Sequence, residues 1–323
     1  MIITLIQILI AVFVALNMGV SGFSVSFAPS YGSRILKRST AVILYSFCIF
    51  FGGILIGPRV VETLANNILT QQFSLISGLI ILFSAGSMMF LSNALKIHQS
   101  TSFVTVASFV GAGLFYGEVN WQSILRIAIA AVIFSALSFI VVFLIKRKIY
   151  PPKEKNLKFY QNFYIHREDF KKIIIFSNMY AAFGMGTNNI ANVVAPIIGS
   201  SAINPVLALA IAAPLFGLGA YMSGERVINT VSKDIVPIGE MSAVIISVVT
   251  ATFVIIASLL GLPTPYVQIT VLSVLAISFV KDGPRYALEK TVFKRMASVW
   301  ILVPLATIAL SFLLHLIFIK PLP

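Results

Sequence analysis

The chain has 323 residues and a net charge of +13; 59% of its residues are hydrophobic and only 10% are charged. Its mean hydropathy of +0.99 excludes a water-soluble domain, because a single core of this size could not hide so much apolar surface, and most of that surface must face lipid. The positive charge does not indicate a nucleic-acid partner, since the basic residues mark the ends of apolar stretches instead of clustering on a soluble domain.

Ten apolar stretches follow one another along the chain, and several reach the roughly 20 residues that a membrane-spanning helix needs. We therefore expect an all-α integral membrane protein with about ten transmembrane segments in two repeats of five. The repeats are expected at residues 1–145 and 173–323, with a cytoplasmic linker at 146–172. The stretches are residues 2–33, 41–57, 72–95, 102–117, 124–145, 173–200, 203–222, 237–261, 265–280 and 298–319.

The first and sixth stretches share a polar, Gly-rich motif. Residues 17–33 recur 167 positions later as residues 184–200 with six of 17 aligned positions identical, where unrelated segments would share about one. Because each repeat has an odd number of segments, the second repeat enters the membrane in the opposite direction. Inverted repeats with such interruptions are typical of secondary transporters, in which broken or re-entrant helices meet at the bilayer midplane.

Charge placement predicts the orientation of the chain in a plasma or bacterial inner membrane. Of the 23 basic residues, 20 lie in alternate loops that start after the first stretch, and only Arg59, Arg126 and Lys320 lie in the others. Since basic residues favour the cytoplasmic side, the first set of loops is expected there, and both termini are expected outside the cytoplasm.

Polar residues inside these apolar stretches are the candidate substrate ligands. Backbone N–H groups at the start of a broken helix bind anions, and hydroxyl and amide groups beside them add donors. The candidates are Ser21, Gly22 and Ser24 in the first motif copy, Thr187, Asn188 and Asn189 in the second, and Ser100, Thr101 and Ser102 at the fourth stretch. Two alternatives stay open, because small residues also permit close helix packing, and Ser100 or Thr101 would also serve as a helix cap.

A second set of residues is a candidate for binding a coupling ion: Ser26, Asn192, Glu240, Gln268 and Thr270. A carboxylate inside the membrane is a candidate proton carrier, and Glu240 is the acidic residue most clearly set in an apolar stretch. A first-turn or snorkelling role at the cytoplasmic end is the simpler interpretation of Glu240. No spacing of Ser, His, Cys or acidic residues indicates an enzyme, a metal site or a cofactor, and a duplicated, inverted motif favours a carrier over a channel.

The segment Gly186-Thr-Asn-Asn-Ile-Ala-Asn192 resembles the GANDVANA signature of the inorganic phosphate transporter (PiT) family, and residues 19–33 resemble the first copy of that motif. The short chain and the degenerate first motif are most similar to the CysP-type sulfate permeases of this family. The resemblance implies a homodimer. The Asp of the family motif is replaced by Gly22 in the first copy and Asn189 in the second, which puts sodium coupling in doubt.

These features together predict a secondary active transporter that imports a tetrahedral oxyanion. Sulfate is a pure hydrogen-bond acceptor and suits a site of N–H, hydroxyl and amide donors, whereas phosphate at neutral pH carries a proton and is best matched by a carboxylate acceptor. We therefore expect sulfate as the substrate, with inorganic phosphate as the alternative. Without a motif Asp, we expect protons rather than sodium as the coupling ion.

Overall fold

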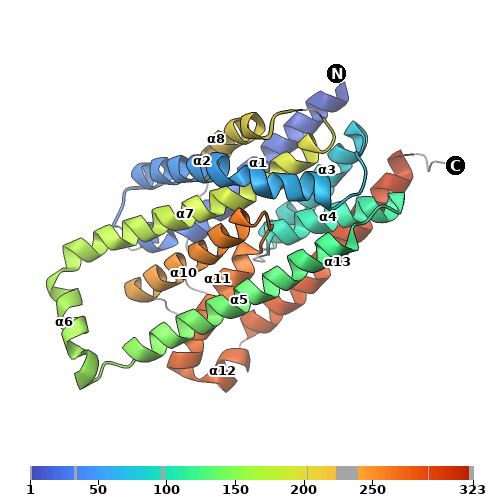
Figure 1. The fold of residues 1–323 in the computed structure, drawn as a ribbon. Helices are drawn as coiled ribbons and strands as arrows, with labels where there is room; N and C mark the ends of the chain where they lie inside the picture. Colours follow the sequence, from blue (N-terminus) through green and yellow to red (C-terminus); the bar gives the residue numbers. More distant parts are fainter. Residues whose placement is uncertain are drawn as a thin grey trace.

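The computed structural model describes residues 2–32, 35–95, 99–201, 203–222, 239–289 and 291–319, and these residues form a bundle of helices (Figure 1). Lys320 and Ser33, the last residue of the first motif copy, lie outside them. The helices are α1 Ile2–Gly32, α2 Arg38–Glu62, α3 Leu75–Ala94, α4 Thr101–Tyr116, α5 Trp121–Ile149, α6 Leu157–Ile165, α7 Arg167–Ile198, α8 Pro205–Met222, α10 Glu240–Leu259, α11 Tyr266–Asp282, α12 Pro284–Glu289 and α13 Thr291–Phe318.

Each of the ten predicted apolar stretches coincides with one long helix, so the protein is an all-helical membrane protein. In the described part of the chain, α1, α2, α3, α5, α8, α10 and α13 are long and apolar enough to cross a membrane by themselves. The helices α4 and α11 are shorter, with 16 and 17 residues, and α7 is interrupted by polar residues. The division into ten segments in two inverted repeats stays a prediction.

The helices α1 and α7, which carry the two motif copies, run in opposite directions. Gln7 Nε2, near the start of α1, donates to Ser200 Oγ, just after the end of α7, at 3.1 Å. Gly22, later in α1, faces Met185, which comes earlier in α7, so the two helices are antiparallel. The halves also exchange partners, because α4 of the first half packs on α13 and α11 of the second half packs on α5. The opposite directions of α1 and α7 are consistent with the expected inverted repeats.

Two helical hairpins, α3–α4 and α10–α11, supply the breaks in the helical pattern. The prediction that the motif copies themselves break their helices is wrong, because α1 and α7 are continuous through residues 17–32 and 184–198. The small residues of these segments allow close packing, so their neighbours approach without interrupting the helix. The chain turns instead between α3 and α4, and at residues 260–265 between α10 and α11.

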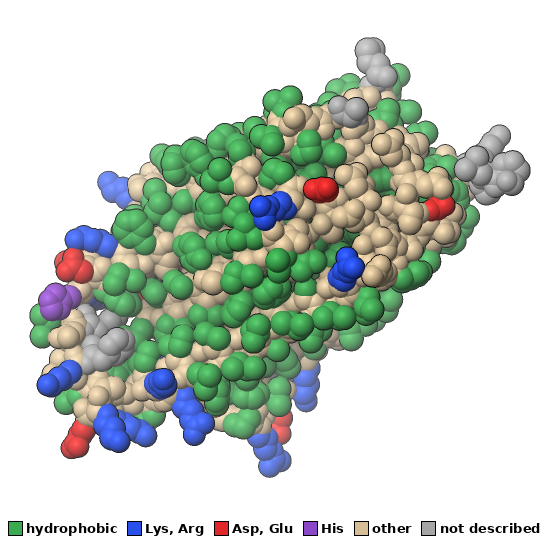
Figure 2. Space-filling model, in the orientation of Figure 1, with side chains coloured by type: hydrophobic (Ala, Val, Ile, Leu, Met, Phe, Trp, Pro, Cys, Tyr) green, Lys and Arg blue, Asp and Glu red, His purple; other side chains and the backbone are tan. Residues whose placement is uncertain are grey.

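The predicted linker is mostly helical. The helix α5 continues to Ile149 and α7 begins at Arg167, so residues 150–166 connect them and include the short helix α6. In Figure 1, α6 joins the ends of α5 and α7 at one end of the bundle, near α12, while the start of α1 and the end of α13 lie at the other. Basic side chains gather at the α6 end in Figure 2. We call this the basic end; it comprises residues 146–172, 281–289 and 293–295.

We predict that Gly52 sets the distance between α2 and α7. A Cβ at this position would overlap the backbone carbonyl of Phe183, so Gly52→Ala should lower the free energy of unfolding by about 1–3 kcal/mol, as overpacking of a filled interface does. Thermal unfolding in detergent measures the change.

Gly239→Ala is the matched control, because Gly239 has φ −70° and a Cβ there meets none of the described residues within 4 Å. Equal melting temperatures for the two variants would contradict the predicted packing constraint at Gly52.

Candidate functional site

Two helix N-termini meet at one side chain in α7. The Ser102 hydroxyl, in the first turn of α4, donates to Asn188 Oδ1 at 2.9 Å. The backbone N–H of Thr264, two residues before α11, donates to the same oxygen at 3.3 Å. The amide of Asn188 therefore joins the tip of one hairpin to the tip of the other.

The nitrogen of the same amide holds the α10–α11 hairpin in place. Asn188 Nδ2 lies within hydrogen-bond distance of Ser258 Oγ at 3.1 Å, Thr264 Oγ1 at 3.2 Å and Leu262 O at 3.3 Å. Thr187 adds a hydrogen bond to Ser258 Oγ at 2.9 Å. Since both ends of the Asn188 amide have partners, this side chain positions the site, and in this conformation it has no idle donor for a substrate.

Asn192, one turn further along α7, contacts the start of α4. Its Nδ2 approaches Ser102 Oγ at 3.2 Å and Thr101 Oγ1 at 3.4 Å. The structure thus brings together five of the predicted residues: Thr101, Ser102, Thr187, Asn188 and Asn192. Ser100 caps α4 by accepting from the Phe103 N–H at 3.4 Å, which agrees with the capping alternative.

Several buried polar atoms on these elements have no hydrogen-bond partner among the described residues: Asn189 Oδ1, Asn192 Oδ1, Gln268 Oε1, and both polar atoms of the Gln99 side chain. All four residues are at most 9% exposed. A buried polar group without a partner costs roughly 2–7 kcal/mol, so these atoms are candidates for contact with a polar ligand or ion. The Asn192 amide can also turn by half a rotation, because the hydroxyls of Thr101 and Ser102 both donate and accept.

The electrostatic character of the site follows from the two helix starts. The first N–H groups of α4 and α11 have no partner within their helices, and the helix dipoles place partial positive charge there. None of the described side chains named in this cluster is a carboxylate. Two positive helix ends, hydroxyls and amides form an arrangement suited to a desolvated anion.

Three serines of the first motif copy form hydrogen bonds within their own helix. The hydroxyls of Ser21, Ser24 and Ser26 donate to carbonyls of their own helix, those of Met18, Val20 and Gly22, at 3.1, 2.9 and 2.6 Å. Gly22 lies against the Tyr45 hydroxyl and Met185 Sδ, where a Cβ would not fit. In this conformation the packing alternative describes α1 better than ligand binding does.

The remaining candidates for a coupling ion are spread along α10 and α11. Thr270 Oγ1 donates to Tyr266 O at 2.9 Å, while Gln268 lies in the first turn of α11, near the cluster. Glu240 begins α10, and at 1.5 Å per residue it lies roughly 27 Å along the helix from Ser258. The first-turn interpretation of Glu240 therefore fits, and the structure does not bring it to the cluster.

Sequence reasoning missed two groups of the network, the hydroxyl of Ser258 and the carbonyl of Leu262, and it favoured a helix-capping role for Thr264, which instead contacts Asn188. A signal was present, because Ser258 ends a long apolar run and Thr264 sits between two prolines, where the chain must turn. Their contact with Asn188 could not be read from spacing, since it joins positions at least 70 residues apart.

We predict that Asn188→Ala destabilises the fold. The substitution strands the Thr264 N–H and the partners of Nδ2 in a buried place, at about 1–3 kcal/mol for each group left unpaired. The melting temperature of the purified protein should fall clearly, whereas Asn17→Ala, which removes only an exposed bond to Phe13 O, should leave it unchanged. An unaltered melting temperature for Asn188→Ala would rule out a stabilising role for the hydrogen bonds of Asn188.

Comparison with known proteins agrees with this picture. The phosphate transporter family matches residues 18–311. The sulfate permease CysP of Bacillus subtilis is 30% identical over 97% of this chain and 87% of its own, and a putative phosphate permease of Thermococcus kodakarensis is 21% identical over 98% of both chains. The solved structure of a sodium-dependent phosphate transporter shares the fold, with a TM-score of 0.82 and 20% identity over 98% of this chain and 99% of its own. The predicted membership is thereby confirmed: the chain belongs to the phosphate transporter family, whose members are transporters and permeases and not enzymes.

Proposed function

We propose that the protein is a secondary active transporter that imports sulfate through the site at the two hairpin tips. The observation that carries this proposal is the meeting of the α4 and α11 N-termini at Asn188. Backbone N–H groups of two facing helix starts supply directed donors to an anion without any cationic side chain, so the ion is held and still released.

The donor set supports sulfate over phosphate. Of the motif positions at which the resemblance implies an Asp, one holds Gly22 and the other Asn189, so the acceptor that hydrogen phosphate needs is absent from both. Thr101, Ser102 and Asn192 each have donors that can turn toward an anion. The similarity to a sulfate permease over 97% of the chain supports the same substrate.

Transport by this architecture is a rocking of two inverted halves about the shared site. The bilayer is the plasma or inner membrane, the basic end faces the cytoplasm, and both termini lie outside. The working unit is a homodimer, as the family resemblance implies.

The proposed coupling ion is the proton, with Glu240 as its carrier. A second candidate, sodium, is favoured by one specific observation: Asn189 Oδ1, Asn192 Oδ1 and Gln268 Oε1 are buried carbonyl oxygens without donors among the described residues. Neutral oxygens of this kind are the ligands that hard cations prefer. Several relatives are named as sodium-dependent phosphate transporters, which is compatible with this candidate.

The substrate is tested by one substitution that restores the carboxylate of the family motif. Asn189→Asp adds an acceptor for hydrogen phosphate and a charge that repels sulfate, so sulfate uptake in proteoliposomes should fall at least about ten-fold, equivalent to about 1.4 kcal/mol. Phosphate uptake should rise relative to sulfate. Wild-type protein that carries phosphate as well as or better than sulfate would overturn the substrate assignment.

The coupling ion is tested by comparing Glu240→Gln and Asn192→Ala under imposed proton and sodium gradients. If protons drive uptake through Glu240, Glu240→Gln flattens the dependence of uptake on pH, because the side chain no longer exchanges a proton. If sodium is the driver, uptake follows the sodium gradient at constant pH, and Asn192→Ala weakens that response. A pH profile of Glu240→Gln identical to wild type excludes Glu240 as the carrier.

A further inference from the structure

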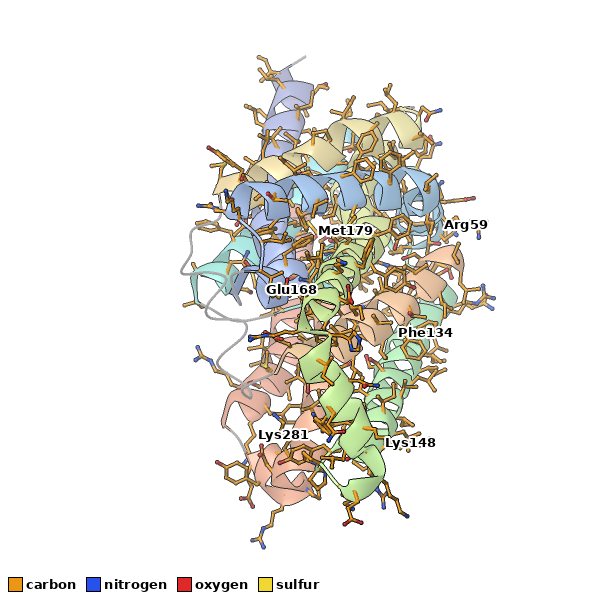
Figure 3. All side chains as sticks on the ribbon, turned by 90° about the vertical axis from the view of Figure 1, so that its left-hand side faces the viewer. Arg59, Phe134, Lys148, Glu168, Met179 and Lys281 are labelled. Atoms are coloured by element: carbon orange, nitrogen blue, oxygen red, sulfur yellow. The ribbon has the colours of Figure 1, made fainter. Side chains whose placement is uncertain are left out.

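A buried lysine lies at the basic end, far from the hairpin tips. Lys146, in the last turn of α5, is only 6% exposed. Its Nζ donates to Ser242 Oγ, in the first turn of α10, at 3.0 Å and lies 5.1 Å from the centre of the Tyr150 ring. Lys148, two residues further along α5, is exposed. Figure 3 shows Lys148 and Lys281 together at this end of the molecule, with Arg59 well away from them.

No carboxylate neutralises this ammonium group among the described residues. The ion pairs found there join Lys171 to Glu168, Lys172 to Asp169 and Arg285 to Glu289. The ammonium group has three N–H donors, and Ser242 accepts one of them. The nearby Lys281 acts on Lys146 with a second positive charge, and the α10 N-terminus adds partial positive charge.

Buried hydroxyls occur at intervals between this lysine and the hairpin tips, along the interface of α5, α10 and α11. Ser258 lies at the Asn188 cluster, and halfway along the interface Ser273 Oγ is 2.5 Å from Ser138 Oγ and 3.5 Å from Thr250 Oγ1. The last of these hydroxyls is that of Ser242, the partner of Lys146, and Ser242 lies roughly 24 Å along α10 from Ser258. Polar groups thus recur from the proposed transport site to the basic end.

We propose that Lys146 and Ser242 form a second binding site for a tetrahedral oxyanion, a release station at the basic end of the transport route. The inference rests on the proposed function for its role in transport, whereas the binding chemistry stands on the local contacts. A buried, unneutralised ammonium is costly, and an oxyanion would accept its unused N–H groups, as it would those at the start of α10. Free sulfate and the phosphate of a lipid headgroup share this chemistry.

Transport assays on opposite faces of the membrane test the release role. In Lys146→Met, the half-saturating sulfate concentration at the basic-end face should rise about five-fold or more, the loss of roughly 1 kcal/mol of a charge-assisted contact, while at the opposite face it stays within about two-fold. Right-side-out and everted membrane vesicles give the two measurements. Lys146→Arg should keep most of the affinity, and Lys148→Met, the matched control on the exposed side of α5, should match wild type.

Ser242→Asp provides a variant whose folding is not at risk. The new carboxylate would pair with Lys146, so the melting temperature should hold or rise while the sulfate affinity at the basic-end face falls as in Lys146→Met. Wild-type affinity in Ser242→Asp, equal changes at both faces, or the same change in Lys148→Met would overturn the proposal.

Equilibrium binding to purified protein keeps the test independent of transport. Radiolabelled sulfate, and separately phosphate, should occupy one site fewer in Lys146→Met than in wild type, even if wild type transports neither ion. Nanodiscs with and without phosphatidylglycerol separate the two sources of the oxyanion. Displacement of the Lys146-dependent sulfate by that lipid would assign the site to a headgroup and overturn the release role, and equal stoichiometry in both proteins would overturn the site itself.

Discussion

The structure depends on a constraint that lipid imposes: backbone N–H groups that begin a helix inside an apolar bundle must find partners there, because no bulk water supplies them. At the starts of α4 and α11, the Asn188 amide oxygen accepts from the Ser102 hydroxyl, in the first turn of α4, and from the backbone N–H of Thr264, two residues before α11. A single planar group with one acceptor and two donors fixes the distance between the two hairpins. The buried side-chain oxygens of Asn189, Asn192 and Gln268 that have no partner among the described residues are the atoms on which the proposed ion site depends.

The close packing of α1, α2, α7 and α8 complements the hydrogen bonds of the Asn188 amide. Gly52 lets α2 lie directly on the backbone of α7, and Gly186 lets α7 lie on the backbone of α2. Without a hydrophobic driving force between helices in lipid, such contact distances supply much of the association energy. The helices α1, α2 and α8 pack around α7, and the tips of the α3–α4 and α10–α11 hairpins contact its Asn-rich turn.

Much of the fold follows from hydropathy, because each apolar stretch became one helix, but the location of the breaks did not. The glycines and serines at residues 17–32 predicted a break in the helix. The hydroxyls of Ser24 and Ser26 instead donate to carbonyls of their own helix, and α1 continues to Gly32. In the site, Asn188, Asn192 and Ser102 were predictable as polar groups in an apolar setting. Ser258 and Thr264 were not, since hydrogen bonding between distant segments depends on helix rotation and hairpin geometry.

The exchange of partners between the halves has a consequence for how such a chain arises. Because α4 packs on α13 and α11 on α5, neither half encloses its own hairpin, and each completes the other. A chain of half this length, inserted in the membrane in both orientations, could build the same bundle from two copies. If the halves are inverted repeats, joining the copies through the segment that contains α6 places one of each orientation in every molecule. The two motifs can then differ, as the serines of α1 and the asparagines of α7 do.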